Sequence, residues 1–62
     1  MKINREKNYT VDRYEANGTD SSYGILPGED VIRILKGYIY DEMMEMWFSK
    51  HCNIGYDVRE IE

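Results

Sequence analysis

Apolar side chains recur at helical spacing through the middle of the chain, and this pattern predicts one long helix over residues 29–52. At about 100° per residue, one broad face of that helix carries eight apolar side chains: Val31, Ile32, Leu35, Tyr38, Ile39, Met43, Met46 and Trp47. Four more fall on nearly the opposite side: Ile34, Met44, Phe48 and Cys52. A short chain can cover one side of a helix but seldom both, so we expect the second side to face a partner.

The expected helix has recognisable ends. Glu29 and Asp30 follow Pro27-Gly28 and complement the positive end of the helix dipole. Asn53 and Gly55 suit a left-handed cap at the far end. Gly37 is a weak point inside the helix, or else it divides the segment into two shorter helices.

Two strand-like segments, residues 9–16 and 19–26, flank Asn17-Gly18. Asn-Gly favours a two-residue type I′ loop, because that turn needs a positive φ at both positions. The resulting register places Tyr14 opposite Ser21, and Val11 opposite Gly24.

A third strand is predicted over residues 54–61, where Ile54, Tyr56 and Val58 alternate with polar residues. A right-handed crossover through the helix places this strand beside the first and antiparallel to it. The predicted fold is therefore α+β: a three-stranded antiparallel sheet (ββαβ, order 2-1-3) with one long helix packed across one face. The helix side expected to cover the sheet carries Ile32, Leu35, Ile39, Met43 and Met46.

The 62 residues make one domain at most, with residues 1–7 expected as a frayed basic end. A single cysteine excludes an internal disulfide, and with one histidine it makes a poor metal set, so we expect no metal or cofactor. Extra stability would then come from a partner or from oligomerisation, although a bare monomer is also possible. We expect a cytoplasmic protein, because the sequence shows neither a signal peptide nor an apolar run long enough for a membrane span.

The net charge of −4 disfavours nucleic acid as the ligand and fits a protein partner with a basic surface. It also fits a chain that is merely kept in solution by its charge. The candidate partner-binding residues lie where apolar and acidic side chains alternate without a Lys or Arg: Tyr40, Asp41, Glu42, Met44, Glu45 and Phe48. The alternative is an ordinary solvated acidic face with scattered surface apolar residues. No catalytic function is predicted, because the carboxylates lie on a convex helix without a Gly-rich phosphate loop.

In size, acidity, tyrosine content and ββαβ layout, the chain resembles the small inhibitors carried by phages and mobile elements, above all anti-CRISPR proteins. Asp41, Glu42 and Glu45, beside Met44 and Phe48, are the residues that carry this resemblance. It implies a mechanism in which acids occupy a basic channel that a CRISPR effector uses for nucleic acid. The leading hypothesis is thus a non-enzymatic protein-binding inhibitor. The alternative is a homo-oligomeric module, formed as a dimer through Met44 and Phe48.

Overall fold

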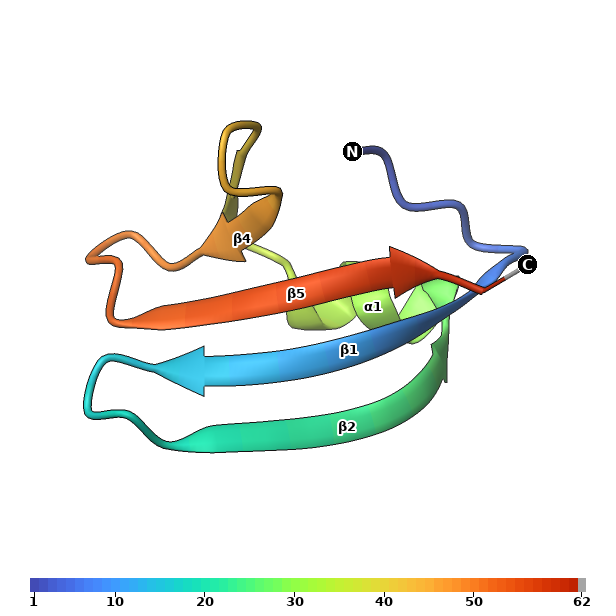
Figure 1. Cartoon of the computed structure of the whole chain (residues 1–62). Helices are drawn as coiled ribbons and strands as arrows, with labels where there is room; N and C mark the ends of the chain where they lie inside the picture. The colour runs from blue at the N-terminus through green and yellow to red at the C-terminus, as the bar shows by residue number, and fades with distance from the viewer. Residues whose placement is uncertain (62) are drawn as a thin grey trace.

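A computed structural model describes residues 1–61 and shows a mostly β protein, with 48% of its residues in strands. The elements are β1 (Asn8–Glu15), β2 (Asp20–Pro27), α1 (Gly28–Ile34), β3 (Ile39–Asp41), β4 (Met46–Phe48) and β5 (Ile54–Glu60). The strands form one five-stranded sheet in the order β2-β1-β5-β4-β3, and all neighbouring strands are antiparallel (Figure 1). The predicted three-stranded α+β fold with one long helix is therefore wrong.

The helix ends early because Gly37 adopts a φ of 85°, which is a left-handed conformation that glycine adopts without strain. The Tyr38 amide donates to the Leu35 carbonyl at 2.9 Å and closes the turn that follows α1. Beyond this turn the chain is rich in aromatic and β-branched side chains, which favour strands. Residues 39–48 accordingly form the β3–β4 hairpin instead of continuing the helix.

The core lies between α1 and one face of the sheet. Its buried side chains come from β1, α1, β5 and the residue after α1: Tyr9, Val11, Val31, Leu35, Tyr56 and Val58. The predicted core was partly wrong, since Met43 is 96% exposed and Ile39 is 67% exposed. Both residues belong to the β3–β4 hairpin, so they do not cover the sheet as the predicted helix would have placed them.

The β1–β2 hairpin has a three-residue loop, Ala16–Gly18, in place of the predicted two-residue loop. The Gly18 amide donates to the Glu15 carbonyl at 2.9 Å, and Gly18 alone in the loop has a positive φ. The Asn17 side chain instead accepts a hydrogen bond from the Thr19 amide at 3.0 Å. This geometry matches the type I turn with a following left-handed residue that three-residue hairpins commonly use.

The register of β1 and β2 differs from the prediction near the loop and agrees with it beyond a bulge in β2. Tyr14 lies opposite Asp20, one residue away from the predicted Ser21. Tyr23 is an extra residue on β2, because Val11 lies opposite Gly24 while Asp12 lies opposite Ser22. The predicted pairing of Val11 with Gly24 is therefore right, because the longer loop and the bulge offset each other.

β5 corresponds to the third predicted strand, and it does pair antiparallel with β1. Its other edge carries β4, which the long-helix prediction had missed. The Gly55 backbone lies under the side chains of Met46 and Phe48, so that a Cβ at Gly55 would stand 3.1 Å from an atom of each. Gly55 thus lets the hairpin pack closely on β5.

The N-terminal segment, for which the sequence suggested fraying, is packed against α1 and the core. Ile3 is partly buried there, and the Asn4 amide donates to the Tyr9 hydroxyl at 2.8 Å. The Gly28 amide at the start of α1 donates to the Lys7 carbonyl at 2.7 Å. Within residues 1–61, no helix is long and apolar enough to cross a membrane.

Candidate protein-binding site

The predicted partner-binding residues all lie in the β3–β4 hairpin, which rises away from the three long strands in Figure 1. Tyr40 faces Trp47 across the two strands, and their ring centroids are 5.0 Å apart. Tyr40 is half-buried by this contact. The aromatic pair fixes the base of the hairpin and leaves its turn to project.

The turn at residues 42–45 is shaped by Asp41. Its Oδ1 atom accepts hydrogen bonds from the backbone amides of Met43 at 2.9 Å and Met44 at 3.1 Å. This is the local capping that an aspartate commonly provides at a turn. Glu45 closes the turn with a φ of 56°, a left-handed conformation that costs a residue with a side chain some free energy. Asp41 is thus a structural residue as well as an acidic one.

The hairpin tip combines exposed apolar surface with negative charge. Met43 is 96% exposed and Met44 is 61% exposed, while Glu42 and Glu45 are also exposed. No lysine or arginine occurs from Gly37 to Ser49. Methionine adapts its shape to varied partners, and flanking carboxylates add charge selectivity. The tip is therefore suited to a surface that is both apolar and basic.

Not all the predicted residues form one surface. Tyr40, Met44 and Glu45 line a common hollow of about 300 Å³ beside Asp57 and Arg59 of β5. Phe48 lies one residue along from Trp47, and its side chain packs over Gly55 on the opposite face of the sheet. Phe48 is half-buried, and its contact with Gly55 holds the hairpin against β5. Met43, for which the helical pattern predicts a core position, is exposed and belongs to the tip instead.

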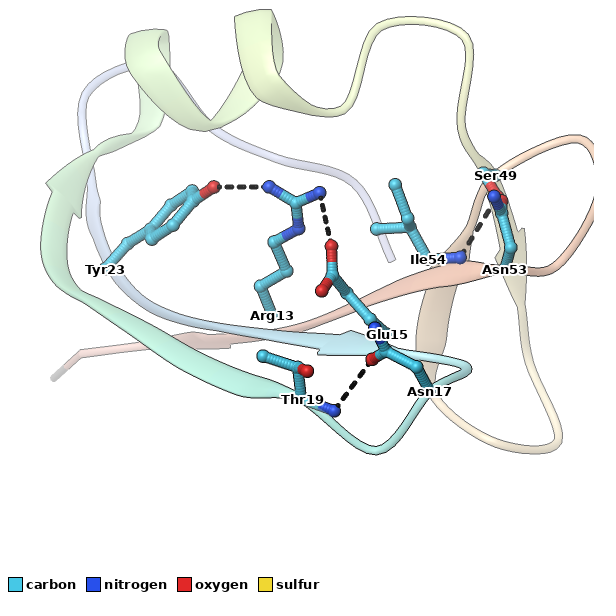
Figure 2. A network of polar contacts seen from close by, with 8 residues as sticks. All are labelled: Arg13, Glu15, Asn17, Thr19, Tyr23, Ser49, Asn53 and Ile54. Carbon is cyan, nitrogen blue, oxygen red and sulfur yellow. Dashed lines mark hydrogen bonds and ion pairs between the residues drawn. The ribbon is translucent and has the colours of Figure 1, made fainter.

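A polar and aromatic cluster on the helix side of the sheet was not foreseen from the sequence. Arg13 lies opposite Tyr56 and donates from Nη1 to the Tyr23 hydroxyl at 3.2 Å and from Nη2 to Glu15 Oε1 at 3.1 Å (Figure 2). The Tyr56 ring lies between Tyr23 and Tyr38, with centroid separations of 5.9 and 5.1 Å. The alternation of apolar and charged residues in β1 gave a weak signal, because Arg13 follows Tyr9 and Val11 on the same face.

The close packing and hydrogen bonds of this cluster shift the pKa values of its members. Hydrogen bonding from Tyr56 and from Arg13 lowers the pKa of Tyr23 below its usual value. Burial is the main reason that the pKa of Tyr56 is raised, with its hydrogen bond to Tyr23 adding to the effect. The pKa of Arg13 is raised chiefly by its hydrogen bond to Tyr23. The Arg13 Nη1 and Nη2 atoms are paired within the fold, while Arg13 Nε is buried without a hydrogen-bond partner among the described residues. These internal contacts are best explained as support for the open end of the core.

A second polar group holds the two loops at one end of the sheet. Ser49 Oγ donates to Asn53 Oδ1 at 2.6 Å and accepts from the Ile54 amide at 3.3 Å (Figure 2). The Ala16 amide donates to the Asn53 carbonyl at 3.0 Å, which ties the β1–β2 loop to the β4–β5 loop. This connection stabilises the end of the sheet remote from α1.

No group of three His, Cys, Asp or Glu side chains with metal-binding geometry occurs in the described residues 1–61. The fold and the hairpin define a small antiparallel β protein with one acidic, methionine-tipped projection. No protein-family model, curated protein or solved structure matches this chain.

Proposed function

We propose that this chain is a non-enzymatic, protein-binding inhibitor that uses the tip of the β3–β4 hairpin. The observation that carries the proposal is the composition of the tip. Two exposed methionines, Met43 and Met44, stand among three acids and no base. A partner surface that is apolar at its centre and basic around it complements this arrangement.

The partner class that we favour is a protein with a basic surface for nucleic acid, such as a CRISPR effector bound to its guide RNA. An acidic protein competes for such a surface because it meets the same positive charges as phosphate does. The small size of the chain and its net charge of −4 over 62 residues support this proposal. The ββαβ layout no longer supports it, since that layout is wrong. Such an inhibitor would act in the cytoplasm.

The test measures binding to effector–guide complexes and inhibition of their DNA cleavage. The informative variant is Glu42→Lys with Glu45→Lys, which reverses the charge of the tip. Asp41 is left unchanged, because its carboxylate holds the turn through the Met43 and Met44 amides. Asp20→Lys is the control for a charge reversal away from the tip, at one position where the double variant has two, because Asp20 is an exposed acid on β2 at the opposite edge of the sheet.

We expect the double variant to weaken binding and inhibition at least about tenfold, and rising salt to weaken the native complex. The Asp20→Lys control should bind as the native chain does. Met44→Ser should also weaken binding, whereas Ile25→Ser, at an exposed apolar position on β2, should not. Undiminished inhibition by the double variant would remove the acidic tip from the mechanism. Failure to bind any effector complex would remove this partner class.

A second candidate function is self-association. Ile39 and Met44 expose apolar surface on the same hairpin, at 67% and 61%. A symmetric contact between two hairpins would cover both. Light scattering over a range of concentrations tests this, with Met44→Asp as the disrupting variant. A monomer at high concentration excludes the candidate and leaves the foreign partner.

A further inference from the structure

An open groove of about 530 Å³ lies between the N-terminal segment, α1 and β4. Its apolar floor includes Ile3, Leu35 and Trp47. The N-terminal segment and the β4 hairpin both rise on the same side of β5 in Figure 1. The volume falls within the range of about 300–1,000 Å³ that is typical of small-molecule sites.

The rim of the groove is positively charged although the chain as a whole is acidic. Three of the eight basic side chains line it, namely Lys2, Arg33 and Lys36, and no acidic side chain of residues 1–61 does. Arg33 also pairs with Glu29 at 3.4 Å and with Asp30 at 4.0 Å. Lys2 and Lys36 have no ion pair with any residue of the described range. They are therefore the charges available to a ligand.

We propose that this groove binds a small amphiphilic carboxylate, which is a free molecule with an apolar chain and one anionic end. The chain would lie against Leu35 and Trp47, and the carboxylate would point to Lys2 and Lys36. The apolar floor supplies most of the affinity, and the lysines select the sign of the head group. No residue of the acidic hairpin tip lines the groove, although Met1 lines both the groove and the hollow beside Met44 and Glu45. The tip would attract a partner of the opposite charge.

Trp47 provides a direct readout, because it is the single tryptophan of the chain and lines the groove. The native protein is titrated with octanoate and octyltrimethylammonium below their micelle concentrations, with octanol below its solubility limit, and with acetate. Tryptophan fluorescence and backbone amide NMR shifts are followed together. We expect octanoate to shift both signals and to bind about threefold to tenfold more tightly than octanol, given the modest strength of exposed ion pairs. Octyltrimethylammonium should bind more weakly than octanol, and acetate should give no saturable change.

The matched variants are Lys36→Glu and Lys50→Glu, which reverse one positive charge on the groove rim and one in the exposed β4–β5 loop. Lys36→Glu should abolish the preference for octanoate over octanol, whereas Lys50→Glu should preserve it. Neither lysine is buried, so both variants should fold.

Three results would overturn the proposal. Equal affinity for the anionic, neutral and cationic probes would indicate non-specific adsorption to apolar surface. Amide shifts centred outside the groove would place the ligand at another site. The absence of any amide shift would show that octanoate does not bind. A dimer that octanoate dissociates, detected by light scattering, would make a second copy of the chain the natural occupant.

Discussion

The backbone of Asn4 occupies the space that a side chain at Gly28 would need. A Cβ built on Gly28 overlaps the Asn4 carbonyl oxygen, and it would stand 2.8 Å from the Asn4 carbonyl carbon and 3.1 Å from Arg5 Cα. The obstructing atoms all belong to the backbone, so no rotation of a side chain relieves the contact. Gly28 is thus required for the close approach of the N-terminal segment to the start of α1.

We therefore expect Gly28→Ala to lower the free energy of unfolding by about 3 kcal/mol, at the upper end of what overpacking costs. It should also detach the N-terminal segment, so that the amide of Lys7 and its neighbours exchange faster with solvent. The control is Gly37→Ala, where a Cβ would meet nothing within 4 Å and only the φ of 85° is unfavourable. That control should cost about 1–2 kcal/mol and leave the N-terminal segment protected. Equal hydrogen exchange in the two variants would contradict the close contact of Asn4 with Gly28.

A second prediction concerns Arg13, which links Tyr23 and Glu15. Replacing it with glutamine leaves the half-buried Glu15 carboxylate without its partner, and we expect a loss of about 1–2 kcal/mol in denaturant unfolding. Arg59→Gln is the matched control, because Arg59 pairs with Asp57 at 3.5 Å while its side chain is 79% exposed. Its loss should stay below about 0.5 kcal/mol, as is usual for exposed ion pairs. Similar losses for both variants would show that the Arg13 cluster does not stabilise the core.

Stability in alkaline solution should depend on Tyr56. Its pKa is raised in the folded chain, mainly by burial. Above about pH 10 the unfolded chain therefore loses this proton first, and the free energy of unfolding falls by at most about 1.4 kcal/mol per pH unit from this group. The pKa of Tyr23 is lowered in the folded chain, so this group raises the free energy of unfolding as the pH rises toward about 10.

The measurement compares denaturant unfolding of the native chain and Tyr56→Phe between neutral and alkaline pH. The variant should lose part of the alkaline decline, whereas Tyr14→Phe, outside the cluster, should keep it. Tyrosinate absorbance gives an independent check, because Tyr56→Phe should also remove the hydrogen bond that lowers the pKa of Tyr23. If the free energy of unfolding falls equally in Tyr56→Phe and in the native chain, groups other than Tyr56 cause the alkaline decline.

The sequence predicted local pairing better than it predicted the central segment. The patterns of residue types and the Asn-Gly signal identified β1, β2 and β5, although the loop length was wrong and the pairing of Val11 with Gly24 is right only because the bulge offsets that error. Residues 39–48 were misread because apolar residues on all sides of a helical wheel also suit two short strands joined by a turn. Gly37 was the decisive residue, since it ends α1 rather than weakening it.

Part of the candidate site stays together despite this error, because its residues are close in sequence. Asp41 to Glu45 are neighbours in a hairpin turn as they would be in a helix. The contribution of each residue could not be predicted in the same way. Asp41 accepts amides within the turn and Phe48 packs under the hairpin, and both facts depend on tertiary pairing. The groove beside Trp47 was beyond sequence analysis, because three separate segments line it.

The last prediction separates the stability of the hairpin from its charge. Glu45→Gly should raise the free energy of unfolding by about 0.5–1 kcal/mol, because glycine adopts a left-handed φ of 56° without strain. Glu42→Gly is the control, since Glu42 lies in the same turn with a negative φ, and it should instead lose up to about 1 kcal/mol. Both variants remove one exposed carboxylate from the tip. If charge drives binding to a basic partner, both should weaken it by a similar factor while their stabilities change in opposite directions. Binding that follows stability rather than charge would show that the partner recognises the rigidity of the turn and not its acids.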